Sequence, residues 1–460
     1  MVAALSGLIF ATSFEPIGIW FCAPLAYALF LKFSLKRGNL YRDSFIFGFV
    51  GSAVTLWWAG KYVGLLPLFF LALLHGLFLL PLGVLGRFTR NILWFIPAIL
   101  ALEELRSHFP FGGFSWMRIA FSQVDSPYAS VISIGGALLL SAWVLALSVL
   151  IVNYRRINLV FIAIALTLPL LMSNSYTSDK SISFVGVQGN TPSVGLAFND
   201  RAEAVFNLHL EKTREASLDG ADLVIWPENA IDVDPFLNTR VSGSIESLTS
   251  DVKVPLIAGA ITRKNGPLEN ISLMYNKSGE VVSLYSKQYL TPFGEFIPLR
   301  PLARIVSPYV DGVSDFSPGE QVDKHVVEDF TLAPVICYEL LSDSLVQRAS
   351  AGSDALVVQT NSATFAGTAE SAQQLNITRL RALENAREIA SVSTIGISAH
   401  IDINGEVLSQ TDEDVSATLR GDLRSNSTIT TANKLGGLAP FLVLIISLIF
   451  PAVARIVRSR

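Results

Sequence analysis

The stretch TLAPVICYE, residues 331–339, is the segment from which the fold is best inferred. It is a short apolar run, and Ser342 and Asp343 follow it as plausible helix caps. A buried strand that leads into a helix in this way is typical of layered α/β domains. The next apolar run, DALVVQTN at 354–361, is likewise followed by a segment of helical periodicity at 369–389. Two successive strand–helix units predict an α/β core.

Strand and helix patterns alternate in the same way through residues 181–430. We predict strands at 181–190, 221–228 and 254–262, a helix at 198–217, and hairpins at 271–287 and 391–410. Lys277-Ser278-Gly279 and Asn404-Gly405 are the expected hairpin turns, because glycine supplies the positive φ that tight turns need. This alternation favours a layered α/β fold.

The remainder of the chain is far more apolar. Only 16% of the 460 residues are charged, against about 25% in soluble proteins, and the long apolar runs gather near both termini. A membrane-spanning helix needs about 20 mostly apolar residues. Eight candidate spans are found at 2–14, 17–34, 44–60, 64–84, 91–106, 128–152, 156–173 and 437–456. We therefore predict an α-helical transmembrane bundle of about eight helices plus the α/β domain: helices 1–7 in residues 1–175, the domain in 181–430, and a last helix with a basic tail in 437–460.

The positions of Lys and Arg predict the orientation of these helices. With a cytoplasmic N-terminus, every inner connection and the C-terminal tail are basic: Lys32, Lys36, Arg37 and Arg42, then Arg87 and Arg90, then Arg155 and Arg156, then Arg455, Arg458 and Arg460. The outer connections carry little beyond Lys61, Arg106 and Arg118. Because basic loops stay inside, we expect a multi-pass protein with both termini cytoplasmic and residues 181–430 outside. This prediction requires an even number of helices.

Composition also excludes several functions. Net charge is −4 and no basic cluster is long enough to suggest nucleic acid, so nucleic acid is not an expected partner. The sequence contains no glycine-rich phosphate loop and no metal-ligand cluster. The two cysteines, Cys22 and Cys337, lie in different parts of the chain, which argues against a disulfide. His75 lies inside a predicted span, where a helix–helix hydrogen bond is a simpler role than proton relay.

Three predicted strands end in side chains that could do chemistry: Glu228, Lys287 and Cys337. A thiol is mostly protonated at neutral pH, so a nucleophilic cysteine needs a base or a cation beside it. Glu228 could take the proton, and Lys287 could favour the thiolate and stabilise a tetrahedral oxyanion. Each residue also has a simpler interpretation: a small buried hydrophobe, a solvated turn and a surface lysine.

In combination, WPE at 226–228, YSKQYLTPFGEFIP at 285–298 and ICYE at 336–339 resemble the nitrilase superfamily. That resemblance implies an αββα sandwich with a Glu-Lys-Cys triad. With seven predicted helices before the domain and one after it, the chain looks like the membrane-bound branch, the apolipoprotein N-acyltransferase family. Shorter similarities are FEPIGIWFCAPL at 14–25, GGFSW at 112–116, FSQ at 121–123, GVQGN at 186–190 and FSPG at 316–319.

The resemblance assigns roles to six residues. It implies Glu228 as general base, Lys287 as oxyanion and charge stabiliser, and Cys337 as nucleophile. It further implies supporting roles for Glu295, Tyr338 and Glu339. For Glu295 and Glu339 the alternative is a salt bridge that only braces the loop.

The implied reaction moves an acyl chain from a membrane phospholipid, through a thioester on the cysteine, to the α-amine of diacylglyceryl-cysteine in an apolipoprotein. The expected location is the bacterial cytoplasmic (inner) membrane, with a periplasmic catalytic domain, a monomeric enzyme and no metal or organic cofactor. One alternative is a membrane-tethered nitrilase-type amidase that hydrolyses a small amide. Another is a transporter or receptor with a non-catalytic domain, but the sequence shows no internal repeat and His75 as the sole candidate ionisable group at mid-membrane.

The sequence departs from the family pattern near the expected acceptor site. Phe198 stands where a Trp is usual, and Thr364 replaces the Trp of an Asn-Asp-x-Trp-Phe motif. The usual His of the next segment corresponds to Gln373 or Gln374, and residues 393–399 differ from the usual Asn-Asn-Gly-x-Thr-Ala. These changes leave the triad intact, and they leave open the preferred acyl chains and lipoproteins.

Overall fold

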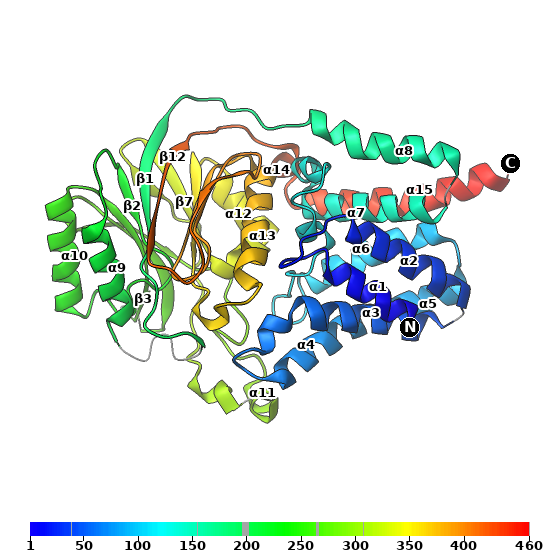
Figure 1. Cartoon of the computed structure of the whole chain (residues 1–460), viewed down its shortest axis with the longest axis horizontal. Coiled ribbons are helices and arrows are strands. Elements are labelled where there is room, and N and C mark those ends of the chain that lie inside the picture. The colour runs from blue at the N-terminus through cyan, green and yellow to red at the C-terminus, as the bar shows by residue number, and fades with distance from the viewer. Residues whose placement is uncertain (38, 154, 196–201, 264–265, 307, 460) are drawn as a thin grey trace. The chain divides into compact units, whose positions relative to one another are not determined.

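The computed structural model describes residues 1–37, 39–153, 155–195, 202–263, 266–306 and 308–459. These residues form two compact units, Met1–Ser173 with Thr430–Arg460, and Asn174–Ile429. The first unit is helical and the second contains all the described strands (Figure 1). Phe198 lies in residues 196–201, outside the described part of the chain.

Each of the eight predicted spans contains a helix of the first unit. Their bounds are α1 Val2–Ala11, α2 Cys22–Arg37, α3 Leu40–Thr55, α4 Leu65–Phe78 with α5 Pro81–Phe88, α6 Phe95–Arg106, α7 Ile132–Val152, α8 Arg156–Thr167 and α15 Leu438–Ser459. Among the described residues, two helical stretches are long and apolar enough to cross a bilayer, Leu65–Phe88 and Ala129–Val152. The helical character of this part is therefore as expected, and the full number of eight crossings stays a prediction.

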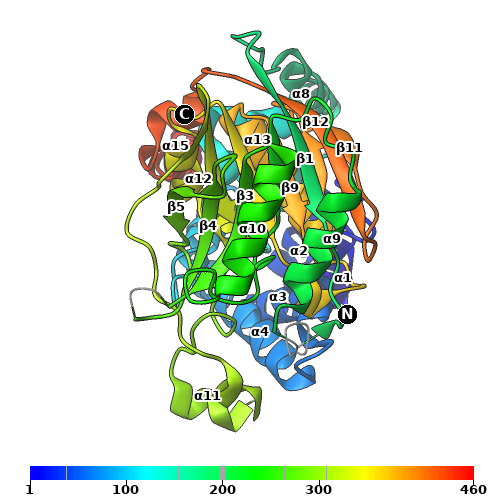
Figure 2. The same ribbon diagram turned by 90° about the vertical axis from the view of Figure 1, so that its left-hand side faces the viewer.

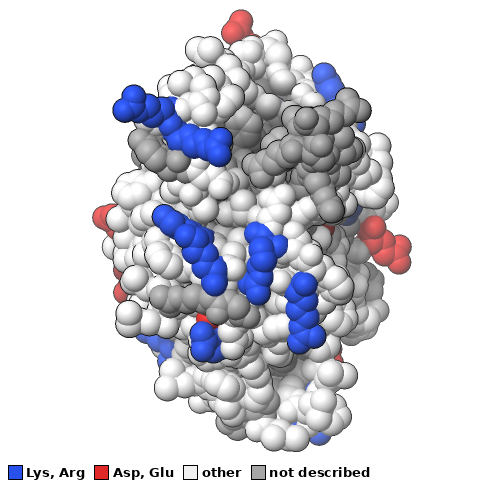
Figure 3. Space-filling model, turned by 90° about the vertical axis from the view of Figure 1, so that its right-hand side faces the viewer, with Lys and Arg blue, Asp and Glu red and all other residues white. Residues whose placement is uncertain are grey.

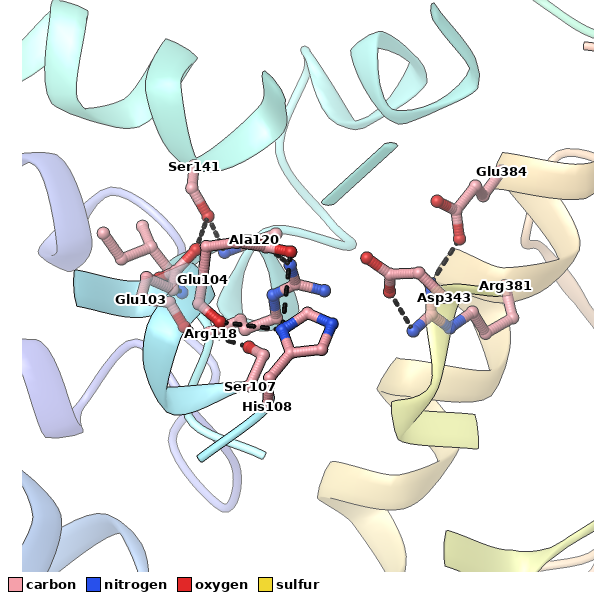
Figure 4. A network of polar contacts seen from close by, with 11 residues as sticks. Glu103, Glu104, Ser107, His108, Arg118, Ala120, Ser141, Asp343, Arg381 and Glu384 are labelled. Carbon is pink, nitrogen blue, oxygen red and sulfur yellow. Dashed lines mark hydrogen bonds and ion pairs between the residues drawn. The ribbon is translucent and has the colours of Figure 1, made fainter. Parts of the chain in front are cut away.

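A buried polar network ties the connection between α6 and α7 to both helices (Figure 4). Glu103 of α6 accepts hydrogen bonds from Ser141 Oγ of α7 at 2.6 Å and from the backbone N–H of Ile119 at 2.8 Å. Arg118 pairs with Glu104 at 2.7 Å. Because buried polar groups need partners, these contacts fix the path of the connection, which contains the short 3₁₀ turns Ile119–Ser122 and Ala129–Val131.

His75 lies between two helices, as its simpler interpretation predicts. Its Nδ1 lies 2.9 Å from the Leu71 carbonyl oxygen, one turn earlier on α4. Its Nε2 lies 2.5 Å from Arg106 Nη1 at the end of α6.

The basic connections gather at one end of the helical unit. Arg90 donates to the Leu35 carbonyl at 3.0 Å, and the Arg87 guanidinium lies 4.9 Å from the Tyr41 ring centroid, which brings two of these connections together. Helix α8, which begins just after Arg155, starts at the same end of this unit as both chain termini (Figure 1). Figure 3 shows blue side chains predominating over red ones on this face.

The second unit is a four-layer sandwich of helices, two sheets and helices (Figures 1 and 2). One sheet has the order β12-β1-β2-β3-β4-β5 and the other β11-β10-β9-β8-β7-β6. The strands are β1 Ser181–Gln188, β2 Leu223–Ile225, β3 Leu256–Thr262, β4 Glu269–Tyr275, β5 Val281–Ser286, β6 His325–Val327, β7 Phe330–Ile336, β8 Ala355–Thr360, β9 Ile389–Ser393, β10 Ala399–Ile401, β11 Val407–Gln410 and β12 Ala417–Arg424. The helices are α9 Ala204–Glu215, α10 Thr239–Val252, α11 Arg300–Val306, α12 Asp343–Ser350 and α13 Glu370–Asn385.

The core explains why the central strands read as continuous apolar runs. β1, β2 and β3 are parallel, as are β7, β8 and β9. Parallel strands are covered on both faces, so both sets of alternate side chains are buried. Phe184 and Leu332 pack between the sheets, while Trp226 packs with Phe206 and Ile245 beneath α9 and α10.

Two strands were not predicted, and one hairpin is narrower than expected. β6 has only three residues, and β12 alternates buried with exposed positions as it pairs antiparallel with β1 from Ser181↔Arg424 to Gln188↔Ala417. Within 391–410, the hairpin is β10–β11, because β9 ends at Ser393 and pairs with β8. Edge strands carry weak local signals, since their pairing partners lie far away in sequence.

Candidate active site

The three predicted strand-end residues lie close after strands of the sandwich. Glu228 is three positions after the end of β2, whereas Lys287 and Cys337 directly follow β5 and β7. The Glu228 carbonyl accepts from Thr394 Oγ1, just after β9 of the other sheet, at 3.0 Å, and the Lys287 N–H donates to the Asn270 carbonyl of β4 at 2.8 Å. Tertiary hydrogen bonds therefore position side chains that lie far apart in the sequence.

The FSPG segment has a clear structural role beside Lys287. The backbone N–H of Gly319 donates to the Lys287 carbonyl at 2.8 Å, and that of Phe316 donates to the Glu295 carbonyl at 2.7 Å. A Cβ at Gly319 would lie 2.2 Å from the Ser286 carbonyl oxygen. Only glycine allows this segment to approach the lysine strand so closely.

Lys287 lies between two carboxylates in a buried site. Its Nζ is 3.1 Å from Glu228 Oε1 and 2.8 Å from Glu295 Oε2, and its side chain is 1% exposed. Burial alone would lower the pKa of Lys287, but the two carboxylates raise it above its ordinary value. Burial would raise the pKa of Glu295, but Lys287 holds it below its ordinary value. The lysine therefore stays charged at neutral pH.

The hydrogen bonds distinguish the two carboxylates. Both oxygens of Glu295 are occupied: Oε1 accepts from Asn270 Nδ2 at 2.7 Å, and Oε2 accepts from Lys287 and from the Thr291 N–H at 2.8 Å. On Glu228 the Asn270 amide at 2.8 Å and Lys287 at 3.1 Å both meet Oε1. Among the described contacts, Glu228 Oε2 is left to accept a proton, so Glu228 is better suited than Glu295 to act as a base.

Cys337 has an unusual backbone conformation at the turn after β7. Its φ is +50°, in the left-handed region, which costs a non-glycine residue about 1–3 kcal/mol and is concentrated at functional sites. Its sulfur is half-buried and lies 3.6 Å from Gln374 Nε2. Burial and Glu228 raise the pKa of the Cys337 thiol well above its ordinary value, although Lys287 acts to lower it. The expectation that Lys287 favours a thiolate is therefore outweighed: the resting sulfur is a thiol that needs a base.

Glu339 supports the turn that carries Cys337 and the loop that follows Lys287. Oε2 accepts from the Ile336 N–H at 2.8 Å, while Oε1 accepts from the Tyr285 hydroxyl and the Gln288 N–H, both at 2.7 Å. Burial raises the pKa of Glu339 above its ordinary value, and these hydrogen bonds partly offset the rise. In the described part of the chain it accepts from backbone N–H groups and a hydroxyl, not from the cation of a bracing salt bridge. Tyr338 stacks on Tyr289 of the loop that follows Lys287 at 5.4 Å between ring centroids.

We expect Glu339→Ala to destabilise the domain by about 3 kcal/mol or more, because each buried donor left without a partner costs about 1–3 kcal/mol. Activity should fall as well, since the turn that carries Cys337 loses its support. Urea unfolding and turnover measure the two effects. Tyr285→Phe is the control, because it removes a single donor and should cost about 1 kcal/mol. A Glu339→Ala variant as stable as Tyr285→Phe would contradict this role.

Helix α13 is fixed to the segment after the nucleophile by Arg381. This buried arginine donates to the Leu340 carbonyl at 2.8 Å, pairs with Asp343 at 2.7 Å, and pairs with Glu384 on its own helix (Figure 4). A buried guanidinium with several acceptors is a rigid tie. It helps to place Gln374, one of the positions where the sequence departs from the family pattern, against the sulfur.

Sequence reasoning missed some residues of this site. Asn270, which bridges Glu228 and Glu295, was not singled out, and neither was Tyr285 beneath Glu339. Asn270 lies just before the predicted hairpin 271–287, and Tyr285 begins the motif YSKQYLTPFGEFIP, but no local pattern assigned a role to either. Gln374 enters the sequence analysis only as a departure from the family pattern, and Thr364, another such departure, lies in the short turn Ala363–Phe365.

Comparison with known proteins agrees with the fold. Residues 187–433 match the carbon–nitrogen hydrolase family, so the α/β domain belongs to that class. Residues 6–150 match the apolipoprotein N-acyltransferase N-terminal domain. The apolipoprotein N-acyltransferase of Mycolicibacterium smegmatis is 30% identical over 94% of this chain and 80% of its own length. That of Photobacterium profundum is 26% identical over 95% and 91%. The chain belongs to the apolipoprotein N-acyltransferase family.

Among solved structures, an amidase from Nesterenkonia sp. is similar to part of this chain. It is 18% identical, with a TM-score of 0.42, over 55% of this chain and 94% of the amidase.

Proposed function

We propose that this chain transfers an acyl chain from a membrane phospholipid, through a thioester on Cys337, to the α-amine of an apolipoprotein's diacylglyceryl-cysteine. The observation that carries the proposal is that both parts of one chain match: residues 6–150 and 187–433 correspond to the helical and hydrolase parts expected of this family. The relatives named above are called apolipoprotein N-acyltransferases, and the match to this chain covers most of their length.

In the first half-reaction Glu228 takes the thiol proton of Cys337, and the sulfur attacks the ester carbonyl carbon of the phospholipid. The C–O bond then breaks, and the lysophospholipid oxygen leaves with the proton that Glu228 holds. An ammonium has three N–H donors, and Lys287 gives two of them to Glu228 and Glu295. The third is available for the negative oxygen of the tetrahedral intermediate.

In the second half-reaction the lipoprotein amine attacks the thioester carbonyl. A C–N bond forms, the C–S bond breaks, and Cys337 regains a proton through Glu228. Such a two-step transfer gives ping-pong kinetics and an acyl-enzyme that can be isolated. Both lipid substrates carry acyl chains held in the bilayer, at about 0.8 kcal/mol per buried CH₂, so a helical part that keeps the enzyme in the membrane suits this reaction.

We further propose that the enzyme crosses the bacterial cytoplasmic membrane eight times, with the α/β domain on the outer side, and that it acts as a monomer. Support comes from the exposed basic residues at one end of the helical unit, among them Arg42, Arg87 and Arg155. Basic segments are retained on the cytoplasmic side.

Single-cysteine labelling in cells tests this orientation. In a chain with Cys22 and Cys337 replaced by serine, a membrane-impermeant maleimide should label Lys277→Cys in the domain of intact cells. Arg155→Cys should react only after the membrane is opened. Both positions are exposed, so a difference reports sidedness and not burial. Labelling of Arg155→Cys in intact cells would overturn the proposed topology.

Mass spectrometry of the purified enzyme tests the reaction. Incubation with phospholipid alone should add the mass of one acyl chain, located on the peptide that contains Cys337. A diacylglyceryl lipopeptide added next should discharge the adduct and gain that mass. Rapid discharge by water with no acylated peptide would instead favour a membrane-tethered amidase, and absence of any adduct would contradict both.

A further inference from the structure

Glu370 is a carboxyl near the nucleophile to which the proposed half-reactions give no task. It is the first residue of the 16-residue helix α13, and Gln374, whose amide touches the Cys337 sulfur at 3.6 Å, lies four positions later. Residues four apart share one face of a helix and are separated by about 6 Å along its axis. Glu370 therefore lies on the face of α13 that is turned toward the sulfur, about one turn from it.

This carboxyl is buried, and one of its oxygens lacks a hydrogen-bond donor among the described residues. Glu370 is 4% exposed, and its Oε2 has no hydrogen-bond partner among the described residues. The adjacent Ser371 hydroxyl is also buried and lies within reach of this carboxyl, as does that of Ser362. Leaving a carboxyl oxygen desolvated without a donor costs about 1–3 kcal/mol, so Oε2 points to a ligand that brings hydrogen-bond donors.

The surroundings of Glu370 favour a donor that is positively charged. Three serine hydroxyls converge beside it: a Cβ at Gly396 would lie 2.7–2.8 Å from Ser371, Ser362 and Ser393 Oγ. The acidic groups that face Glu370 are Glu413, from the loop after β11, and Glu228, from the loop after β2. The Cys337 sulfur faces it from the turn after β7. A site built from carboxyls and hydroxyls binds an ammonium with three N–H donors.

The proposed reaction requires such a site. Near pH 7 most α-amines are ammonium ions, with pKa values of about 7.7–8.0, and an ammonium has no lone pair with which to attack. Glu228 can accept only the proton that the amine loses after attack and pass it to the sulfur. The first proton needs a second acceptor.

We propose that Glu370 binds the ammonium of the acyl acceptor and takes its first proton, so that the amine meets the thioester uncharged. This inference rests on the proposed function and adds a catalytic residue to its second half-reaction. The N–H bond of the ammonium breaks, the electron pair stays on nitrogen, and the proton forms an O–H bond on Glu370. The freed pair then forms the C–N bond as the C–S bond breaks.

Proton affinities support this transfer. Burial raises the pKa of Glu370 to about 8, with Glu413 and Glu228 adding to the rise. The bound ammonium favours the carboxylate form of Glu370, as any opposite charge nearby does. Because an α-amine also has a pKa of about 8, the proton then moves between the two groups at little cost. Desolvation disfavours both charged forms, which favours the neutral pair of carboxylic acid and free amine.

Glu370→Gln separates the two half-reactions. Glutamine has the same shape, and Glu370 has no task in the first half-reaction, so formation of the acyl-enzyme from phospholipid should proceed at the normal rate. Transfer to a diacylglyceryl lipopeptide should fall about tenfold or more near pH 7, where about one α-amine in ten is neutral, and should recover as the pH rises through about 8. Transfer to hydroxylamine, which is uncharged near neutral pH, should not change.

Two further variants complete the test. Glu370→Asp keeps the carboxyl and should retain more transfer than Glu370→Gln, and Glu211→Gln makes the same chemical change at an exposed site on α9 and should behave as wild type. Normal lipopeptide transfer by Glu370→Gln near pH 7, or an equal loss with hydroxylamine, would overturn the role of Glu370. Failure of acyl-enzyme formation in the wild-type protein would overturn the proposed function instead.

Discussion

Replacing Cys337 with alanine is expected to abolish the acyl-enzyme completely while leaving the protein folded. Without the sulfur no thioester can form, and neither Glu228 nor Lys287 can serve as the nucleophile, because each is held in the buried ion pair at 3.1 Å. The side chain removed is small and half-buried, so the free energy of unfolding should change by less than about 1 kcal/mol. Intact-protein mass spectrometry after incubation with phospholipid measures the adduct, and urea unfolding measures the stability.

Cys22→Ala is the matched control for this variant. Cys22 is the other cysteine of the chain and begins helix α2 of the helical unit. The control should keep the full adduct and the full transfer activity. An acyl adduct that persists in Cys337→Ala, or disappears in Cys22→Ala, would place the nucleophile elsewhere.

Lys287→Met should cause the second large effect, because it removes the cation between two buried carboxylates. Glu228 and Glu295 would then face each other through Asn270 with no ammonium to offset their charges. Breaking a buried ion pair by removing one partner costs about 3–5 kcal/mol. The loss of an oxyanion donor lowers the rate by about 10²–10³. The free energy of unfolding and the rate of acyl-enzyme formation should therefore both fall strongly.

The pH dependence of stability should change in the same variant. Burial would raise the pKa of Glu295, but Lys287 holds it below its ordinary value. In the wild type this carboxylate therefore stabilises the fold above its unfolded pKa, about 4.3, and the contribution is lost as the pH falls through the lowered pKa. Lys287→Met should lose this contribution, so acid unfolding should begin at a higher pH.

A double variant separates stability from catalysis. Adding Glu295→Gln to Lys287→Met removes one of the opposed charges, so part of the lost stability should return while activity stays low. Lys277→Met, in the exposed turn between β4 and β5, is the control and should match the wild type. Near-normal turnover by Lys287→Met would reduce Lys287 to a structural residue.

Much of the α/β domain could be predicted from local patterns, because strand and helix periodicities depend on near neighbours in the chain. The runs that became β1, β3, β7 and β8 were predicted to within a few residues, and so was α13. β6 and β12 were missed because one is very short and the other is an edge strand whose partner, β1, is more than two hundred positions away.

The sequence by itself determined that this chain has a helical part and an α/β part, and that Glu228, Lys287 and Cys337 end strands, because periodicity and apolar run length are local properties. Only the tertiary structure decided which groups meet. Glu228 and Lys287 lie 59 positions apart, yet both are hydrogen-bonded to Asn270 of β4. The Glu228 carboxylate accepts from the Asn270 side-chain amide, and the Lys287 backbone N–H donates to the Asn270 carbonyl. Both oxygens of Glu295 accept hydrogen bonds in the structure, whereas one oxygen of Glu228 remains available as an acceptor among the described contacts. The Gln374 side-chain amide lies against the Cys337 sulfur. Such distances follow from sheet order and helix packing, which bring together side chains that no local pattern connects.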